Sequence, residues 1–322
     1  MDDARHRALT LRARLYTVIR AFFAERAVIE VDTPILGQAA STDIHLESFD
    51  TGYTGPANGG ARRRFLRTSP EFWHKRLLAE GLGDCYELGR VFRNGEFGRR
   101  HNPEFTLLEW YRLGWTSAQL MAEVEELVRT TFMFSGRRLG ESRTWTYRQL
   151  FRQHLDVDPL TAPIDDLRRL ASQFWVDAGK LDRDALLDVL LTHRIEPALP
   201  ADGLTFVHEY PASQAALART RADSDGERVA ERFELYVGTV ELANGFHELT
   251  DAAEQQARFR ADNVERERRG LEPLPWDRHL VMALESGLPA CSGVALGVDR
   301  LLMAMLGSED IREVLAFSFP DA

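Results

Sequence analysis

The sequence predicts an α+β fold built around an antiparallel sheet, because helical and strand patterns are interleaved without the regular βαβ rhythm of a parallel sheet. Apolar residues between Ala8 and Phe23 recur at three- and four-residue steps, which predicts an amphipathic helix over the first two dozen residues. Residues 85–93 and 104–112 each alternate with period two. The polar stretch 94–103 between them then predicts a long-looped antiparallel hairpin.

Local signals predict the remaining elements. Ser69, Pro70 and Glu71 supply a hydroxyl cap, a proline and an early acid, which is typical of a helix start. Further strands are expected over 28–31, 65–67, 204–210 and 232–246, and the last is expected to be interrupted at Gly238 and Gly245. Further helices are expected over about 71–81, 251–270 and 298–306. A loop is expected over 52–60. We expect one catalytic domain over 1–322, in which residues 138–200 form a mostly helical insertion.

Composition excludes several classes of protein. The 322 residues are 44% apolar, enough for a large core, and no run of 18 apolar residues is present. The charged N-terminus lacks the apolar stretch of a signal peptide, so we expect a cytoplasmic protein without a membrane segment. Cys85 and Cys291 are too far apart to indicate a disulfide framework or a zinc site. A net charge of −10 argues against a broadly nucleic-acid-binding surface, although a local basic patch could still bind one.

Residues suited to a nucleotide flank the loop of the predicted hairpin. Four polar residues stand at its ends: Arg93, Asn94, His101 and Asn102. Guanidinium groups bind phosphate oxygens in a fork, and an aromatic face such as Phe105 can stack on a base. Four residues of the second strand share one face: Phe105, Leu107, Glu109 and Tyr111. An acid and a phenol thus stand where a core strand uses apolar residues. The alternative is that Arg93 is only a solvated charge at a strand end.

Three acids occur in segments that otherwise have the apolar pattern of buried strands: Glu234, Glu241 and Glu248. A buried carboxylate is costly unless it meets a metal, a cation or hydrogen-bond donors. Magnesium bound with ATP phosphates, or the ammonium group of a substrate, would satisfy them. An exposed edge strand whose acids face water is the alternative.

Small residues and an arginine combine in residues 292–301. The small residues let the backbone approach a ligand, and Arg300 lies in the first turn of a helix whose N-terminus favours anions. The chain has neither a Gly-rich run ending in Gly-Lys-Ser/Thr nor a Gly-x-Gly-x-x-Gly turn, so a P-loop or Rossmann nucleotide site is not expected.

These segments, in their order along the chain, resemble the three motifs of class II aminoacyl-tRNA synthetases. The matching residues are Thr33-Pro34, then Phe92-Arg93-Asn94 with His101-Asn102-Pro103-Glu104-Phe105, then Gly297-Val298-Asp299-Arg300. Within that class, Ser69-Pro70-Glu71 and the run Glu-Leu-Ala-Asn-Gly-Phe-His-Glu-Leu over 241–249 are similar to lysyl-tRNA synthetase. The resemblance covers nearly the whole chain and implies a class II catalytic core.

Lysyl-tRNA synthetases carry an N-terminal OB-fold that binds the anticodon, before the motif 1 helix. This chain starts directly at the motif 1 helix. It therefore most resembles their truncated paralogues, which attach a lysyl group, preferably (R)-β-lysine, to a lysine side chain of elongation factor P. The resemblance implies a ligase that uses ATP and Mg²⁺, forms an acyl-adenylate and transfers the acyl group to an amine. It also implies a homodimer paired through the motif 1 region and no anticodon-dependent tRNA binding.

The resemblance assigns roles position by position. Arg93 and Arg300 are the expected catalytic residues, and Glu234 and Glu241 the expected magnesium ligands. The expected ATP contacts are Arg93, Asn94, Gly95, Asn102, Phe105, Glu241, Leu242, Gly297 and Arg300, with Phe105 stacked on adenine. The expected amino-acid pocket consists of Ser69, Pro70, Glu71, Glu109, Tyr111, Asn244, Phe246, Glu248 and Ala295. In it Glu71 meets the near amino group, and Glu109 and Glu248 surround the distal ammonium.

Two positions depart from lysyl-tRNA synthetases. Ala295 replaces a glycine beside the amino-acid pocket, a change that the truncated paralogues share, and Gly95 stands where motif 2 has an acid, with Glu96 next. Two other functions stay open at this point. The chain could be a free-standing synthetase that acts on tRNA or a small acceptor, or a non-catalytic regulator that senses amino acid or nucleotide.

Overall fold

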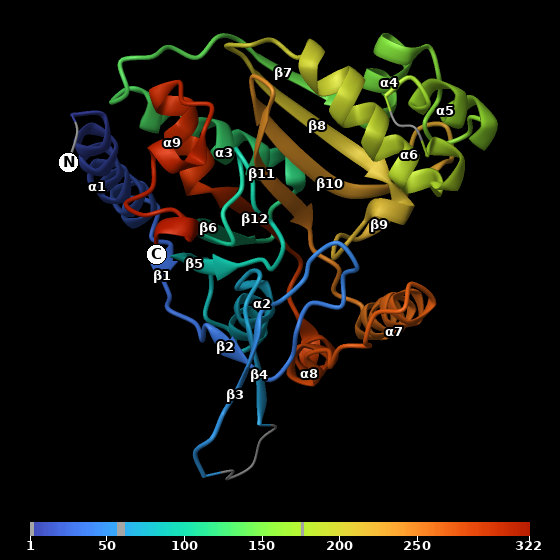
Figure 1. The fold of residues 1–322 in the computed structure, drawn as a ribbon. Helices are drawn as coiled ribbons and strands as arrows, with labels where there is room; N and C mark the ends of the chain where they lie inside the picture. Colours follow the sequence, from blue (N-terminus) through green and yellow to red (C-terminus); the bar gives the residue numbers. More distant parts are fainter. Residues whose placement is uncertain (1–2, 57–61, 175–176) are drawn as a thin grey trace.

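Two sheets organise the chain, which the computed structural model describes over residues 3–56, 62–174 and 177–322 (Figure 1). Along the larger sheet the strands follow the order β1 (Ile29–Glu30), β5 (Cys85–Phe92), β6 (Glu104–Leu113), β12 (Cys291–Gly297), β11 (Val240–His247), β10 (Arg228–Val237), β8 (Leu204–Pro211) and β7 (Ser142–Thr146), and β9 (Thr220–Ala222) also pairs with β10. Neighbours are antiparallel except at the two edges, where β1 runs parallel to β5 and β7 to β8. The predicted α+β fold with an antiparallel sheet is confirmed.

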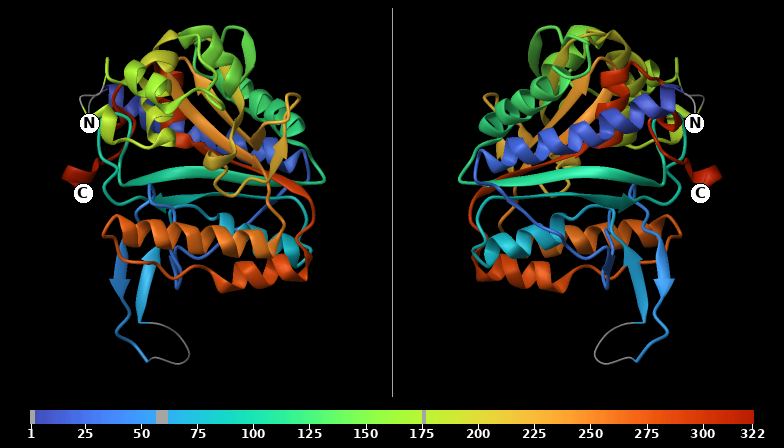
Figure 2. Two further views of the ribbon diagram at one scale, coloured as in Figure 1. Left: turned by 90° about the vertical axis from the view of Figure 1, so that its right-hand side faces the viewer. Right: turned by 90° about the vertical axis from the view of Figure 1, so that its left-hand side faces the viewer.

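Helices cover both faces of the larger sheet, and in Figure 2 they lie on opposite sides of its strands. One face packs on α1 (Asp3–Ala24), α3 (Ser117–Phe132) and α9 (Val298–Leu306) in the main apolar core. The other face meets α2 (Glu71–Ala79), α7 (Ala252–Arg268) and α8 (Arg278–Gly287) in a smaller core that buries Cys85 and Cys291 as free thiols. A second small sheet follows the order β2 (Leu36–Gly37), β4 (Arg63–Leu66) and β3 (Asp50–Gly52).

The expected helical insertion over 138–200 begins with a strand that the sequence pattern did not indicate. β7 is an edge strand of five residues with no clean alternation of buried and exposed side chains, and its parallel pairing to β8 is non-local. Three helices follow, α4 (Tyr147–Leu155), α5 (Ile164–Ala171) and α6 (Arg183–Leu190), the last continued by a π-helical turn over Leu191–Ile195. These helices bury a core of their own against β8 and β10.

The predicted strand over 232–246 is two strands, and one of its two expected breaks is wrong. Gly238, with φ +58°, lies in the turn between β10 and β11 as expected. Gly245 instead continues β11, where it is paired with Phe233 of β10 and Val294 of β12. A glycine stands there because the Phe233 ring occupies the space of a side chain: a Cβ on Gly245 would lie 2.4 Å from that ring. The loop expected over 52–60 lies partly outside the described residues. In the part of the chain that the structure describes, no helix has the length and apolar character needed to cross a bilayer.

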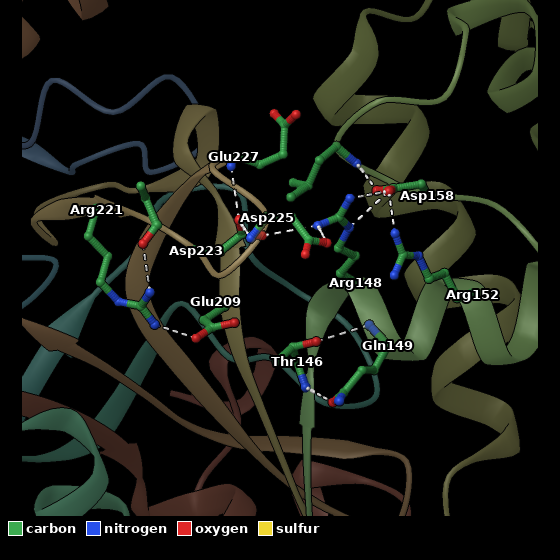
Figure 3. Close-up of polar contacts among 12 residues, drawn as sticks. Thr146, Arg148, Gln149, Arg152, Asp158, Glu209, Arg221, Asp223, Asp225 and Glu227 are labelled. Atoms are coloured by element: carbon green, nitrogen blue, oxygen red, sulfur yellow. Dashed lines mark hydrogen bonds and ion pairs between the residues drawn. The ribbon is translucent and has the colours of Figure 1, made fainter.

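A cluster of charged residues fastens the insertion to the turn between β9 and β10 (Figure 3). Arg148 of α4 donates from Nη2 to Asp158 (2.6 Å) and from Nη1 to Asp223 (3.1 Å) and Asp225 (2.6 Å). Burial raises the pKa of Asp158, but hydrogen bonds from Arg148, the Leu160 amide and Arg152 outweigh it and lower the pKa to about 2. Arg148 is thus the shared counter-ion of three carboxylates.

Replacing Arg148 with alanine is expected to lower the free energy of unfolding by about 1–2 kcal/mol, because three acids then face one another without it. Chemical denaturation measures the loss. Arg152→Ala is the control, since Arg152 is half exposed and donates to Asp158 alone, and it should cost less than about 0.5 kcal/mol. The contribution of Asp158 is present above pH 4 and is lost as pH falls toward 2. Equal losses in the two variants would contradict this assignment.

Candidate active site

A cavity of about 1460 Å³ opens on the sheet face that meets α2 and α7. Most of the predicted site residues line it: Ser69, Glu71, Arg93, Asn102, Phe105, Glu109, Tyr111, Glu234, Glu241, Leu242, Asn244, Phe246, Glu248, Ala295, Gly297 and Arg300. Pro70, Asn94 and Gly95 are not among the lining residues. Pro70 is the cap of α2, and Gly95, with φ +81°, makes the turn after β5 while Glu96 lines the cavity in its place.

Strand register explains why residues so distant in sequence share one cavity. Glu234 of β10 is paired with Asn244 of β11, Asn244 with Ala295 of β12, and Ala295 with Glu109 of β6. These four residues therefore form one row across four strands, and side chains in such a row lie on the same face of the sheet. The row runs from Glu234, a predicted magnesium ligand, to Glu109 of the predicted ammonium pocket.

Arginines gather at one end of the cavity. The Arg93 guanidinium lies 5.1 Å from the centre of the Phe105 ring and 3.7 Å from Glu96 Oε1, and its buried Nε has no hydrogen-bond partner among the described residues. Arg300 donates from Nη1 to the backbone oxygen of Glu241 (2.9 Å) and from Nη2 to His101 Nε2 (2.7 Å). Burial, and then the charge of Arg300, lower the pKa of His101, so the ring stays neutral and accepts this bond. Two guanidinium groups thus face a space beside an aromatic ring.

Carboxylates gather at the other end. Glu109 is buried, and it accepts hydrogen bonds from the hydroxyls of Ser69 and Tyr111, both at 2.8 Å. It has no ion-pair partner within the described ranges. Burial, reinforced by the charge of Glu71, raises the pKa of Glu109 to about 8. Because an isolated buried carboxylate is unfavourable, this geometry suits the binding of a cationic group.

Glu71 and Glu248 complete the acidic end and share a buried lysine. Lys75 Nζ lies 2.6 Å from Glu71 Oε1 and 2.6 Å from Glu248 Oε2, and the Lys75 and Glu248 side chains are each 1% exposed. Glu248 Oε1 has no hydrogen-bond partner among the described residues. Burial and the neighbouring acids raise the pKa of Glu248, Lys75 lowers it, and the result is about 8.

Gly293 lets the Tyr111 ring and the Glu248 carboxylate lie close to the backbone of β12. A Cβ at this position of β12 would lie 2.3 Å from the Tyr111 ring and 2.6 Å from Glu248 Oε1. Both groups therefore rest directly on the backbone of β12. A glycine is required here for close approach and not for an unusual backbone conformation.

The two predicted magnesium ligands lie at the opposite end and already have protein partners. Glu234 accepts hydrogen bonds from the hydroxyls of Tyr210 (2.5 Å) and Tyr236 (2.7 Å) and from Arg232 (2.5 Å). Glu241 lies 3.2 Å from Arg300 Nη1. Across the described residues, no group of three or more His, Cys, Asp and Glu side chains is placed to hold a metal by itself. The role of this pair stays a prediction.

Several residues of the cavity and its support were not indicated by sequence reasoning. They are Lys75 behind the acidic end, and Arg232, Tyr210, Tyr236 and Glu196 around Glu234. Lys75 stands four residues after Glu71, so a helix places the two side chains on one face, and this spacing could have indicated the pair. The contact of Lys75 with Glu248 carries no such local signal.

Comparison with known proteins shows the family to which the chain belongs. Residues 1–320 match the family described as tRNA synthetases class II (D, K and N), and the chain belongs to this family of class II tRNA synthetases. It is similar to a protein of Enterobacter sp. (strain 638) named Elongation factor P--(R)-beta-lysine ligase, with 49% identity over 313 residues that cover 96% of this chain and 94% of that protein. Proteins of the same name from Salmonella arizonae and Klebsiella pneumoniae are 48% and 47% identical with the same coverage. The family predicted from the three motifs is confirmed.

Proposed function

We propose that this chain activates (R)-β-lysine, or lysine, with ATP as an aminoacyl-adenylate and transfers the acyl group to a lysine side chain of elongation factor P. The observation that carries the proposal is the similarity, over 96% of the chain, to proteins named for this ligation. The cavity supports it independently, since arginines suited to phosphates stand at one end and carboxylates suited to ammonium groups at the other.

The expected chemistry needs charge stabilisation more than proton transfer. The substrate carboxylate attacks the α-phosphorus of ATP, pyrophosphate leaves, and Arg93 and Arg300 stabilise the charge on the phosphate oxygens. The neutral amine of the acceptor lysine then attacks the adenylate carbonyl, and an amide forms as AMP and one proton of the amine leave. In this assignment Phe105 stacks on adenine, Asn102 contacts ATP, and Glu71, Glu109 and Glu248 hold the amino groups of the substrate.

Magnesium fits the end of the cavity that holds Glu234 and Glu241. Burial, and then the charges of Glu234 and Glu241, raise the pKa of the neighbouring Glu196 to about 7, which indicates repulsion between negative charges at this end. A cation would relieve this repulsion, and Mg²⁺ commonly takes one or two protein carboxylates together with phosphate oxygens. Bound there, it would neutralise charge on the phosphates of ATP. The expected homodimer, paired through the motif 1 region, belongs to the same proposal and is tested by light scattering in solution.

The decisive experiment is an intact-mass assay of elongation factor P incubated with the chain, ATP and one amino acid at a time. The expected result is a gain of one lysyl residue with (R)-β-lysine, a slower gain with lysine, and none when the acceptor lysine is replaced by arginine. An unchanged mass with lysine and with both β-lysine enantiomers would contradict the proposal. The alternative, a free-standing synthetase, predicts aminoacylation of bulk tRNA at a comparable rate, and the names of the relatives do not favour it.

A further inference from the structure

Lys75 occupies an unusual position, because its side chain is as deeply buried as that of Glu248 and more deeply buried than that of Glu71. Its Nζ lies 2.6 Å from Glu71 Oε1 and 2.6 Å from Glu248 Oε2, with the side chain 1% exposed. Burial lowers the pKa of Lys75, but the charges of Glu248 and Glu71 outweigh it and raise the pKa above the ordinary value. Lys75 therefore carries its positive charge throughout the physiological pH range.

Lys75 stands behind the pocket and not in it. Glu71, Glu109 and Glu248 all line the cavity, whereas Lys75 does not. Its ammonium group therefore contacts both acids from the protein side and leaves their cavity sides to a ligand. A residue in this place acts on a ligand through the two carboxylates, without touching it.

Charge counting shows what this lysine does to the pocket. With all three carboxylates ionised their charges sum to −3, and the ammonium group of Lys75 reduces the sum to −2. The next acid, Glu87, already has partners of its own: Arg67 Nη2 at 2.6 Å, and hydrogen bonds with Thr33 and His74. Among the described residues, two negative charges of the ionised pocket then remain without a counter-ion, and (R)-β-lysine and lysine each carry two ammonium groups.

We propose, on the basis of the proposed function, that Lys75 is a positioning residue that holds the Glu71 and Glu248 carboxylates from the protein side. It sets the charge of the fully ionised pocket at −2. A diamino acid therefore displaces protons from the pocket acids as it binds. Without a ligand, a buried charge of −2 is unfavourable, and the acids hold protons instead. Two incoming ammonium groups replace those protons and restore neutrality.

At the acidic end, two carboxylates titrate near pH 8. Burial raises the pKa of Glu109 and that of Glu248 to about 8 each. Five neighbouring groups keep one protonation state over this range. Burial raises the pKa of Tyr111, Cys85 and Cys291. Burial lowers the pKa of neutral His74, and hydrogen bonds hold the pKa of Glu87 at about 2 against the effect of burial. Because the ligand favours ionised acids, its affinity rises as pH increases toward 8.

Calorimetry on the unmodified protein tests the proton displacement. Titrations with (R)-β-lysine or lysine in two buffers of different ionisation enthalpy are expected to show release of one to two protons per ligand at pH 7 and little release above pH 9. Affinity should fall about tenfold per pH unit below pH 8 for each proton displaced. Norleucine, which lacks the distal ammonium, should bind more weakly and release fewer protons. Binding without proton release at pH 7 overturns this inference alone, whereas no binding at any pH overturns the proposed function.

Two variants test Lys75 itself. Lys75→Met removes the charge with little change of length and is expected to weaken (R)-β-lysine binding by about 100-fold. It should also move the pH at which binding is strongest upward, with the KM for ATP unchanged. Lys75→Arg disturbs packing but keeps the charge, so its pH profile should match the unmodified protein even if its stability falls. A purely structural lysine predicts unaltered pH profiles in both variants, and that result overturns the proposal. If Lys75→Met does not fold, the calorimetry on the unmodified protein still decides.

Discussion

Replacing Arg93 with alanine is expected to lower amino-acid-dependent pyrophosphate exchange by about three orders of magnitude, which corresponds to roughly 4 kcal/mol of transition-state stabilisation. The expectation follows from the place of Arg93 at the cavity wall, where its buried Nε lacks a hydrogen-bond partner among the described residues and its guanidinium stands beside Phe105. A guanidinium held in this way is available for phosphate oxygens. The loss should appear mainly in the maximal rate, because the charge it stabilises develops on the α-phosphate.

Two further variants make this test specific. Arg93→Lys keeps the charge but loses the planar fork, so it should retain intermediate activity. Arg90→Ala is the matched control, because Arg90 lies on β5 just before Arg93, is half exposed, lies 3.6 Å from Glu104 and does not line the cavity. Its exchange rate should stay within about twofold of the unmodified protein, as expected for a surface ion pair. Equal effects of Arg90→Ala and Arg93→Ala would contradict the role given to Arg93.

Gly293→Ala is expected to weaken amino-acid binding by about 100-fold or more and to lower the free energy of unfolding by about 1–3 kcal/mol. The added Cβ would lie 2.3 Å from the Tyr111 ring and 2.6 Å from Glu248 Oε1, so both groups must move. Tyr111 donates to Glu109, and Glu248 pairs with Lys75, so one methyl group disturbs the whole acidic end. Binding is measured by calorimetry and stability by denaturation.

Gly245→Ala separates packing from binding in this experiment. Gly245 lies in the neighbouring strand, and its added Cβ would meet the Phe233 ring at 2.4 Å, which belongs to the main apolar core. We expect a comparable loss of stability, about 1–3 kcal/mol, with a much smaller change in amino-acid affinity. If the two variants lost affinity equally, the effect at Gly293 would be one of folding and not of pocket geometry.

Much of the site could be predicted because its signals are local. Alternation over residues 104–112 placed Glu109 and Tyr111 on one strand face, and the structure shows both lining one cavity. Charged residues inside apolar strand patterns indicated Glu234 and Glu248 in the same way. Such signals extend over a few residues and depend only on the period of a strand or helix.

Patterns and motifs along the chain therefore predicted the fold class, the family and most of the residues around the cavity. The tertiary structure alone decided that β12 lies between β6 and β11, that β7 pairs in parallel with β8, and that Lys75 bridges Glu71 and Glu248. The physical reason is that these contacts join segments far apart in the chain. These contacts form only when the whole sheet is assembled and particular charges are buried together. A short periodic pattern in the sequence predicts neither the strand order nor the buried charge pairs.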